Sequence, residues 1–484
     1  MALAWAVPAQ ALDWRFEPAL DASATFTDNA GNTASNKDEA MILRVAPGFT
    51  LRSEKSPRVE AGMHYGLSGV KRFGDEQSDD LFHTLNASGK AELVEDFLFV
   101  EGNARVSQEL IDLLGSQADA TTSSSNRATV GTYSLSPYVM KRLGTFANAS
   151  ARYTASGAIF ENNVASTQRV NSFAAGLASG TRFADFTWAL DYSIRDARNR
   201  NNIDTRFERA GLTLGHTLTR KFRVFGTVGE EWNDYPAPPG TDIDGPFYSM
   251  GVGWSPSRRT SIEASAGERS YGRSYGLTAR HRTRTTNWNL SYADDVSDMA
   301  QFLQASGTVY NYLCVGADGS LSLIENWPYA FPPATSGCIA FGGTPGLLFD
   351  LRSGVFVART LRGSVGWTLG KVTHTLGYSD SRRDYVASGI EDRTRVLGLT
   401  TTYRMSRQTT ANAGLTLTRT QVSPTPLSPV ARDDDLFSLS LGVSHRFAED
   451  LSGALTFRHT QRDSNVATAD YDENSLTASV SLRF

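Results

Sequence analysis

A two-residue alternation of apolar and polar side chains recurs along this chain and constrains its fold more than any other feature. In the segment 436–447 (LFSLSLGVSHRF), the odd positions from Phe437 to Val443 are apolar, and the even positions from Ser438 to Ser444 are Ser or Gly. Successive side chains of a β-strand point to opposite faces, so this segment has one oily and one polar face. A helix of the same sequence would scatter its serines around the whole cylinder. The pattern therefore predicts a strand.

The same alternation recurs in segments such as 59–68, 98–107, 355–369 and 412–418. Counting these segments predicts about 22 strands, each near or above the roughly 9–11 residues that cross a bilayer when tilted. The expected strand centres are Ala22, Val45, Met63, Leu85, Asn103, Leu135, Ala151, Leu177, Leu190, Leu212, Val228, Val252, Ala264, Leu277, Leu290, Leu361, Leu376, Leu399, Leu415, Leu441, Leu455 and Val480.

Connections between these segments alternate between long and short. Long polar loops are expected to follow odd strands, at 28–39, 73–80, 112–126, 199–204, 234–245, 294–350, 379–392, 421–435 and 462–473. Short turns are expected after even strands, at 95–96, 143–144, 184–185, 220–221, 257–258, 370–371, 406–407 and 449–450. Outer-membrane barrels have long loops outside and short turns in the periplasm. An even strand number then places both termini in the periplasm.

The strands are expected to face lipid and to close into a cylinder. Hydrophobic residues make up 40% of the 484 residues, yet no stretch approaches the roughly 18 apolar residues of a membrane helix. In hydrocarbon, each unpaired backbone group costs several kcal/mol, so a sheet with open edges is excluded. A soluble sandwich or propeller is the alternative, but such folds rarely keep Ser, Gly and Thr opposite the apolar face of such long strands. We therefore predict an all-β fold, a single transmembrane antiparallel up-and-down barrel of residues 12–484.

Aromatic residues support the same prediction, because aromatic rings prefer the headgroup level of a bilayer. Those close to the short turns or the C-terminus are expected to form a girdle at one interface: Phe97, Phe186, Phe222, Trp254, Trp367, Tyr403, Phe447 and Phe484.

The N-terminus, 1–11 (MALAWAVPAQA), has the features of the end of a secretory signal. Ala9-Gln10-Ala11 fits the small-x-small pattern of a cleavage site, which would make Leu12 the first mature residue. A frayed apolar N-terminus is the alternative. Together with the predicted barrel, the signal indicates the outer membrane of a Gram-negative bacterium, with lipid and lipopolysaccharide as surroundings.

Two parts of the chain resemble known proteins. The last strand, LTASVSLRF, alternates through Val480 and Leu482 and ends in Phe484, which resembles the C-terminal signal of the outer-membrane barrel assembly machinery. The segments 14–29 (WRFEPALDASATFTDN), 43–51 (LRVAPGFTL), 85–112 and 132–143 resemble the uncharacterised outer-membrane barrels associated with PEP-CTERM/exosortase systems. That resemblance, distinctive in the first 150 or so residues, implies a setting of exopolysaccharide production and supplies no catalytic residues.

The sequence indicates neither an enzyme nor a nucleic-acid-binding protein. With 47 basic and 51 acidic residues, the net charge of −4 gives no broad positive field for a nucleic-acid backbone. The chain has no HExxH motif, phosphate loop or CxxC pair that would indicate a catalytic or cofactor site. A barrel-embedded hydrolase would need a Ser–His pair on one face, but the seven histidines are spread over different predicted strands. No cofactor is expected.

Only two cysteines occur, Cys314 and Cys338, both in the longest predicted loop. Because the periplasm is oxidising, a disulfide between them is expected, worth about 3 kcal/mol in the chain-entropy model. A constrained plug or recognition flap is the functional alternative. Acidic clusters at Asp433–Asp435 and Asp294-Asp295 could bind Ca²⁺, but solvated loop charge explains them equally well.

The polar face is expected to carry mixed charge into the lumen, where either ion pairing across the wall or steering of an anionic polymer would explain it. The candidates are Glu101, Arg105, Arg195, Glu231, Arg280, Arg362, Arg382 and Arg458. A barrel of about 22 strands is roughly 40–45 Å across, too wide for wall side chains to fill. The first predicted strand begins almost at the mature N-terminus, so no room is expected for a globular plug. The lumen is then expected to be partly open, flattened, or occluded by infolded loops or a partner.

Three hypotheses follow for function. The leading one is a passive pore or export conduit linked to exopolysaccharide secretion, with exopolysaccharide or periplasmic export components as partners. The second is a structural or surface-display barrel whose outer loops bind polymer, protein or phage. The third is a sheath around an electron-carrying multihaem protein.

Overall fold

The computed structural model describes residues 13–54, 58–74, 79–112, 115, 126–161, 167–199, 204–299, 301, 310–315, 321–327, 338–340, 352, 354–424 and 430–484. Among these residues, no helix is both long enough and apolar enough to cross a membrane.

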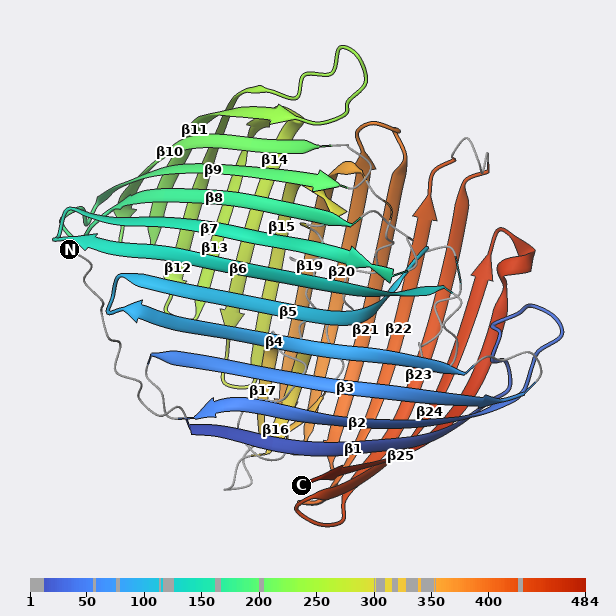
Figure 1. Cartoon of the computed structure of the whole chain (residues 1–484). Coiled ribbons are helices and arrows are strands. Elements are labelled where there is room, and N and C mark those ends of the chain that lie inside the picture. Colours follow the sequence, from blue (N-terminus) through green and yellow to red (C-terminus); the bar gives the residue numbers. More distant parts are fainter. Residues whose placement is uncertain are drawn as a thin grey trace, which may run out of the picture.

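The alternating segments form one closed antiparallel sheet of 22 strands, so the predicted fold class and strand count are confirmed (Figure 1). Each strand pairs with its predecessor, β15 pairs with β19, and β25 pairs with β1. The strands are β1 Asp13–Thr27, β2 Ala40–Glu54, β3 Val59–Phe73, β4 Asp80–Val94, β5 Leu98–Leu110, β6 Arg127–Leu143, β7 Ala147–Phe160, β8 Gln168–Ser179, β9 Phe186–Asn199, β10 Thr205–Thr219, β11 Phe222–Asp234, β12 Gly245–Ser257, β13 Thr260–Arg269, β14 Gly272–Arg282, β15 Thr286–Asp298, β19 Val355–Leu369, β20 Val372–Tyr385, β21 Glu391–Arg404, β22 Thr409–Val422, β23 Arg432–Arg446, β24 Leu451–Ser464 and β25 Tyr471–Arg483.

Every expected strand centre falls inside its own strand, from Ala22 in β1 to Val480 in β25. Ala22 is also where the closure can be seen, because it lies opposite Val45 of β2 on one side and opposite Val480 of β25 on the other. Both edges of the first strand are therefore hydrogen-bonded, and the ring has no free edge at this level.

The connections differ from the expectation in length. The segment 379–392 was expected to be a loop, but β20 continues to Tyr385 and β21 begins at Glu391, so only five residues remain between them. β13 and β14 are joined at the same rim by only Ser270 and Tyr271. The predicted loop 294–350 begins later, because β15 runs to Asp298. It contains a separate three-stranded sheet of β16 Tyr310–Val315, β17 Leu321–Trp327 and β18 Cys338–Ala340. A short 3₁₀ turn, Ala467–Ala469, precedes β25.

Large apolar side chains cover the outer face. In β23, Leu441 and Val443 are about half exposed, whereas the intervening Gly442 belongs to the lumen face. Cross-strand register extends this into continuous rows: Leu441 lies opposite Ala413 on one side and Phe457 on the other. A sheet with its apolar side chains outside and its polar side chains inside has the reverse of a soluble barrel's polarity, and this arrangement suits lipid.

Seven members of the predicted aromatic girdle lie on this outer face near the short turns or the C-terminus, whereas Phe97 lies in the β4–β5 turn, two residues before Phe99 of the lumen face. Seven of the eight girdle members are exposed, and Trp367 is half-buried because it stacks on His374 with ring centroids 5.0 Å apart. The short turns themselves are tight. Gly144 and Gly370 adopt φ angles of +59° and +60° there, a left-handed conformation that favours glycine.

Candidate functional site: a charged lumen crossed by the end of β15

Strand register assigns each predicted lumen charge to a face of the wall. Seven of the eight candidates share the face opposite the exposed apolar rows, so they face the lumen: Glu101, Arg105, Arg195, Glu231, Arg280, Arg362 and Arg458.

Arg382 is the exception, and its expected place in the lumen was wrong. It lies six residues beyond Leu376 on β20 and therefore on the same outer face, with Tyr378 and Asp380 between them. Tyr378 is the last exposed apolar side chain of this strand's outer face, and the charged residues follow it. The strand thus continues beyond the apolar band, where an outward charge need not contact hydrocarbon.

The lumen wall between β14 and β24 carries cations that have no counter-ion among the described residues. Arg280 of β14, Arg362 of β19 and Arg458 of β24 are exposed, and none forms an ion pair or side-chain hydrogen bond there. Their cross-strand neighbours are small and neutral. Arg362 lies between Ser291 and Ser379. These arginines are therefore available to an anion in the lumen.

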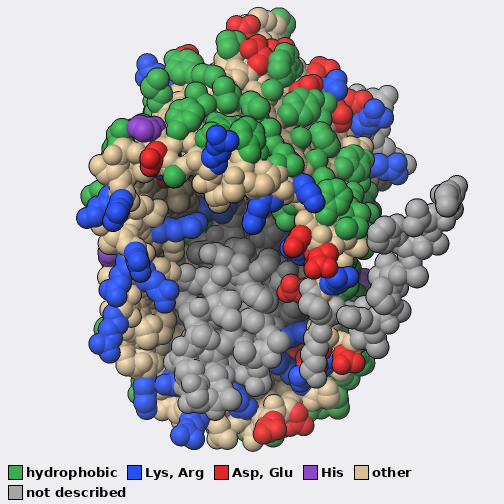
Figure 2. Space-filling view, turned by 90° about the vertical axis from the view of Figure 1, so that its left-hand side faces the viewer, with side chains coloured by type: hydrophobic (Ala, Val, Ile, Leu, Met, Phe, Trp, Pro, Cys, Tyr) green, Lys and Arg blue, Asp and Glu red, His purple; other side chains and the backbone are tan. Residues whose placement is uncertain are grey.

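Acidic side chains occupy the wall half a circumference away. Glu60 lies on the third strand, eleven positions from Arg280, and Glu101 lies on the fifth, eleven positions from Arg362. Glu60 has no ion pair among the described residues, whereas the Glu101 carboxylate accepts hydrogen bonds from Arg152 (2.7 Å) and Tyr138 (2.8 Å). Viewed from the short-turn rim, Lys and Arg gather on the left of the opening and most Asp and Glu on the right (Figure 2). The wall that bears these acidic side chains also carries cations, among them Arg105 of β5 and the Arg152 that pairs with Glu101, so its charge is mixed.

Nearer the long-loop rim, the end of β15 crosses the lumen. Met299, directly after β15, is 1% exposed and packs on Ala128, Val130, Ala158 and Phe160, which belong to the lumen faces of β6 and β7. In the ring, β15 neighbours only β14 and β19. A contact with β6 and β7 therefore requires the end of β15 to reach across the interior.

An ion pair fixes this crossing. Asp298, the last residue of β15, accepts two hydrogen bonds from the Arg195 guanidinium of β9, one of them 2.8 Å from Nη2 to Oδ1. Both side chains are largely buried. A second chain of contacts joins β11, β13 and β15, because Arg269 binds Glu231 through Nε and Asp295 through Nη1, each at 2.7 Å.

Apolar packing surrounds these ion pairs. Val296 of β15 and Val355 and Val357 of β19 are buried in one cluster with Tyr235, against Phe207 of β10. Burial, with the negative charges of Glu231 and Asp244 nearby, raises the pKa of Tyr235 to about 12. Burial also raises the pKa of Tyr271 in the β13–β14 turn, whose hydroxyl donates to Asp294 Oδ1 at 2.8 Å.

On the opposite face of the β15–β19 hairpin, Phe356 is fully buried and its ring packs on Tyr385 at 5.2 Å. The hairpin end is therefore covered on both faces. The connection between β5 and β6 also contacts a distant strand, β24. Arg462 of β24 donates a hydrogen bond to the carbonyl oxygen of Gly115 in this connection, at 2.7 Å. Together these contacts narrow the lumen near its long-loop end.

The remaining predicted residues lie elsewhere. Cys314 of β16 and Cys338 of β18 are direct cross-strand partners in the small sheet, and the disulfide between them stays a prediction. Val480 and Phe484 lie exposed at the end of the barrel wall, and their role as an assembly signal also stays a prediction. The proposed cleavage site at 9–11 lies outside the described residues. Within the described part of the chain, no three His, Cys, Asp or Glu side chains gather into a metal site.

Comparison with known proteins finds likeness at the level of structure. No protein-family profile matches the chain, and no curated protein sequence does. The siderophore receptor PirA from Acinetobacter baumannii superposes with a TM-score of 0.53 at 10% identity, over 98% of this chain and 81% of the receptor. A mutant of the ferric enterobactin receptor PfeA from Pseudomonas aeruginosa gives 0.51 at 9% identity, over 97% and 80%. The FrpB iron transporter from Neisseria meningitidis, as apoprotein, gives 0.50 at 11% identity, over 97% and 81%.

This likeness shows the fold, a closed antiparallel barrel of 22 strands.

Infolded loops were one of the expected states of the lumen, but the segment that crosses it was not identified from the sequence, although a signal was present. Val355-Phe356-Val357-Ala358 is apolar at four consecutive positions, whereas a wall strand between water and lipid alternates. A strand that is apolar on both faces is buried on both faces. These four consecutive apolar residues therefore indicated the part of the β15–β19 hairpin that leaves the barrel wall.

Proposed function

We propose that the chain is an outer-membrane β-barrel that serves as a passive pore or export conduit, linked to exopolysaccharide secretion, and that it has no catalytic role. The outer membrane is the location that suits a closed barrel with an apolar outer face and the folds of the receptors that resemble it. The link to exopolysaccharide rests on the resemblance of the N-terminal segments to barrels of exosortase systems.

The observation that carries the conduit proposal is a set of lumen arginines that form no ion pair in the described part of the chain, Arg280, Arg362 and Arg458. A barrel that served only as a scaffold would gain nothing from cations without counter-ions. A stretch of pore wall that carries one sign of charge concentrates ions of the opposite sign beside it and raises their entry rate. An anionic polymer or small anion is the cargo that this wall favours.

Planar-bilayer recording of the purified barrel tests this proposal. We expect stepwise conductance and a reversal potential in a KCl gradient that indicates preference for chloride. The triple variant R280S/R362S/R458S should lose that preference. R382S/R393S/R395S, which removes the same charge from the outer face, should retain it. The absence of any conductance under all conditions, or the same chloride preference in the two triple variants, would contradict the proposal.

A second function, a structural or surface-display barrel, is favoured by the crossing of the lumen at Asp298 and Met299. A lumen closed there would leave the long-loop rim as the working surface. Gene deletion separates the two functions. Loss of secreted polysaccharide supports the conduit. Normal secretion with loss of polymer, protein or phage binding to cells supports surface display.

A further inference from the structure

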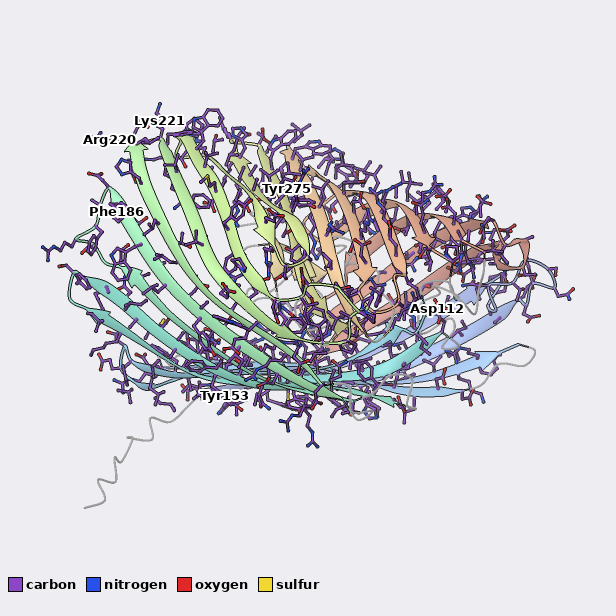
Figure 3. The ribbon with its side chains drawn as sticks, turned by 90° about the horizontal axis from the view of Figure 1, so that it is seen from above. Asp112, Tyr153, Phe186, Arg220, Lys221 and Tyr275 are labelled. Atoms are coloured by element: carbon purple, nitrogen blue, oxygen red, sulfur yellow. The ribbon has the colours of Figure 1, made fainter. Side chains whose placement is uncertain are left out.

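The short turns of one arc of the barrel are strongly basic. Six consecutive turns, from β8–β9 to β21–β22, contain only one acidic residue, Asp185. Their basic residues are all exposed, and none forms an ion pair within the described chain: Arg182, Arg220, Lys221, Arg258, Arg259, Arg284, Lys371 and Arg407. On one side of this arc the next turn is acidic, with Glu449-Asp450 after β23. On the other side the β6–β7 turn is uncharged, and the β4–β5 turn beyond it carries Glu95-Asp96. Figure 3 shows Arg220 and Lys221 at the tip of their turn, on the rim opposite Asp112.

The outer wall directly above two of these basic turns is grooved. The groove spans β9 to β13 and is lined chiefly by apolar groups, including Leu214, Val224, Met250 and Val252. Its floor is low because Gly226 and Ala264 occupy outward positions between larger neighbours. Met250 stands at its side and is 76% exposed.

A second groove lies farther along the same arc, above the turns that carry Arg284 and Lys371. It is lined by Trp288, Leu290, Val365 and Leu376, with hardly any polar surface. Each groove thus stands above basic turns, and the arrangement repeats along the wall.

The vertical order of these features matches an amphiphile with a negatively charged head. On β11, which begins directly after the β10–β11 turn, Gly226 of the groove floor lies four residues farther from the turn than Phe222, about 13 Å along the strand. Phe222 and Trp254 are cross-strand partners between the groove and the cations of the turn. An acyl chain in the groove would place its glycerol near the aromatic pair and its phosphate within reach of Arg220, Lys221 and their neighbours.

We propose that this basic arc binds anionic glycerophospholipids in the leaflet that meets the short turns, with acyl chains in the two grooves. The inference rests on the membrane location of the proposed function, and not on conduction. An acidic soluble protein could pair with the cations, but it would leave the apolar grooves above them uncovered. Each Lys or Arg near a membrane surface contributes about 1 kcal/mol to attraction of anionic lipid. Eight cations on one arc, without ion pairs among the described residues, therefore concentrate that lipid on one side of the barrel.

Native mass spectrometry of the full-length barrel tests the proposal, with phosphatidylglycerol and phosphatidylcholine added separately to the detergent solution. We expect wild-type protein to retain phosphatidylglycerol preferentially. Replacing two cations in R220S/K221S should weaken its retention roughly tenfold or more, since each contributes about 1 kcal/mol. K37S/K71S removes two exposed lysines at the long-loop rim and is the charge-matched control that should bind normally.

A second variant tests the groove without changing charge. A Cβ at position 226 would meet only the Ser249 carbonyl oxygen, at 3.7 Å, so Gly226→Leu can fill the groove without a clash in the wall. We expect G226L to weaken phosphatidylglycerol retention while heat-modifiable gel mobility shows an intact barrel. Equal retention of both lipids, an equal loss in K37S/K71S, preferential retention of lipopolysaccharide, or an acidic protein bound to the arc irrespective of G226L would each overturn the proposal.

Discussion

Arg195 and Asp298 are the two residues on which the narrowing of the lumen depends most directly. Their side chains are largely buried and make two hydrogen bonds to each other. Removing one partner of a buried ion pair leaves the other charge uncompensated, at a cost of about 3–5 kcal/mol. We therefore expect D298A to lower the free energy of unfolding by about that amount, measured by denaturant titration in detergent. R195A/D298A should lose less than the two single variants together. Additive losses would mean that the two residues act independently.

Tyr235 gives a residue-scale prediction about pH. Its pKa is raised from 10 to about 12, because burial and neighbouring carboxylates oppose the phenolate. Between these pH values the folded state holds a proton that the unfolded state has lost, so stability falls as pH rises through this window, by about 1.4 kcal/mol per pH unit. Spectrophotometric titration should show a phenolate forming near pH 12 that is missing from Y235F. A wild-type-minus-Y235F difference that titrates near pH 10 would refute the assignment.

At the scale of elements, the end of β15 is the part of the barrel that leaves its wall. Met299 packs on Val130 across the lumen, although β15 and β6 are not neighbours in the sheet. With Cys314 and Cys338 replaced by Ser, M299C/V130C should form a disulfide on mild oxidation. A protease cut between the two positions would then leave the fragments joined until reduction. M299C/L441C, which pairs residue 299 with an outward-facing position, is the control and should not cross-link. Failure of the first pair to link while the barrel is folded would contradict the crossing.

The same elements show how far sequence reasoning reaches. Strand positions and most lumen charges were predictable because alternation is local: Arg280 and Arg362 face inward because their neighbours in sequence face outward. Arg382 was misplaced because β20 is longer than expected. Every charged residue of the wall was assumed to face the lumen, and this assumption fails where a strand extends beyond the apolar band. The crossing of β15 depends on contacts between Met299 and strands more than a hundred residues earlier, and no local period encodes such a distance. Likewise, the pairing of Arg195 with Asp298 could not be predicted, since each has many possible partners in sequence.

At the scale of the whole molecule, charge is distributed over the lumen wall and over the short-turn rim. Arg280 and Arg362 lie half a circumference from a wall of mixed charge that carries Glu60, Glu101 and Arg105, and the basic turns occupy one arc of the short-turn rim. Such a distribution acts on ions through the field of many groups and not through one site, and its reach is set by salt. The screening length is about 10 Å at 0.1 M and about 3 Å at 1 M ionic strength, which compares with a backbone diameter of roughly 40–45 Å for a barrel of this size.

Ion preference should therefore depend on salt in a way that a narrow binding site would not. In planar bilayers we expect the preference for chloride over potassium to be largest near 0.1 M KCl and to approach unity near 1 M, because only the ions within a few ångströms of an arginine still sense it. R280S/R362S/R458S should show little preference at either concentration. If wild-type selectivity stayed constant over this range, selection would occur by contact in the constriction at Asp298 and Met299, and Arg280, Arg362 and Arg458 would have no part in it. The dependence of ion selectivity on salt concentration thus shows whether ions are selected along the arginine-bearing wall or at the constriction.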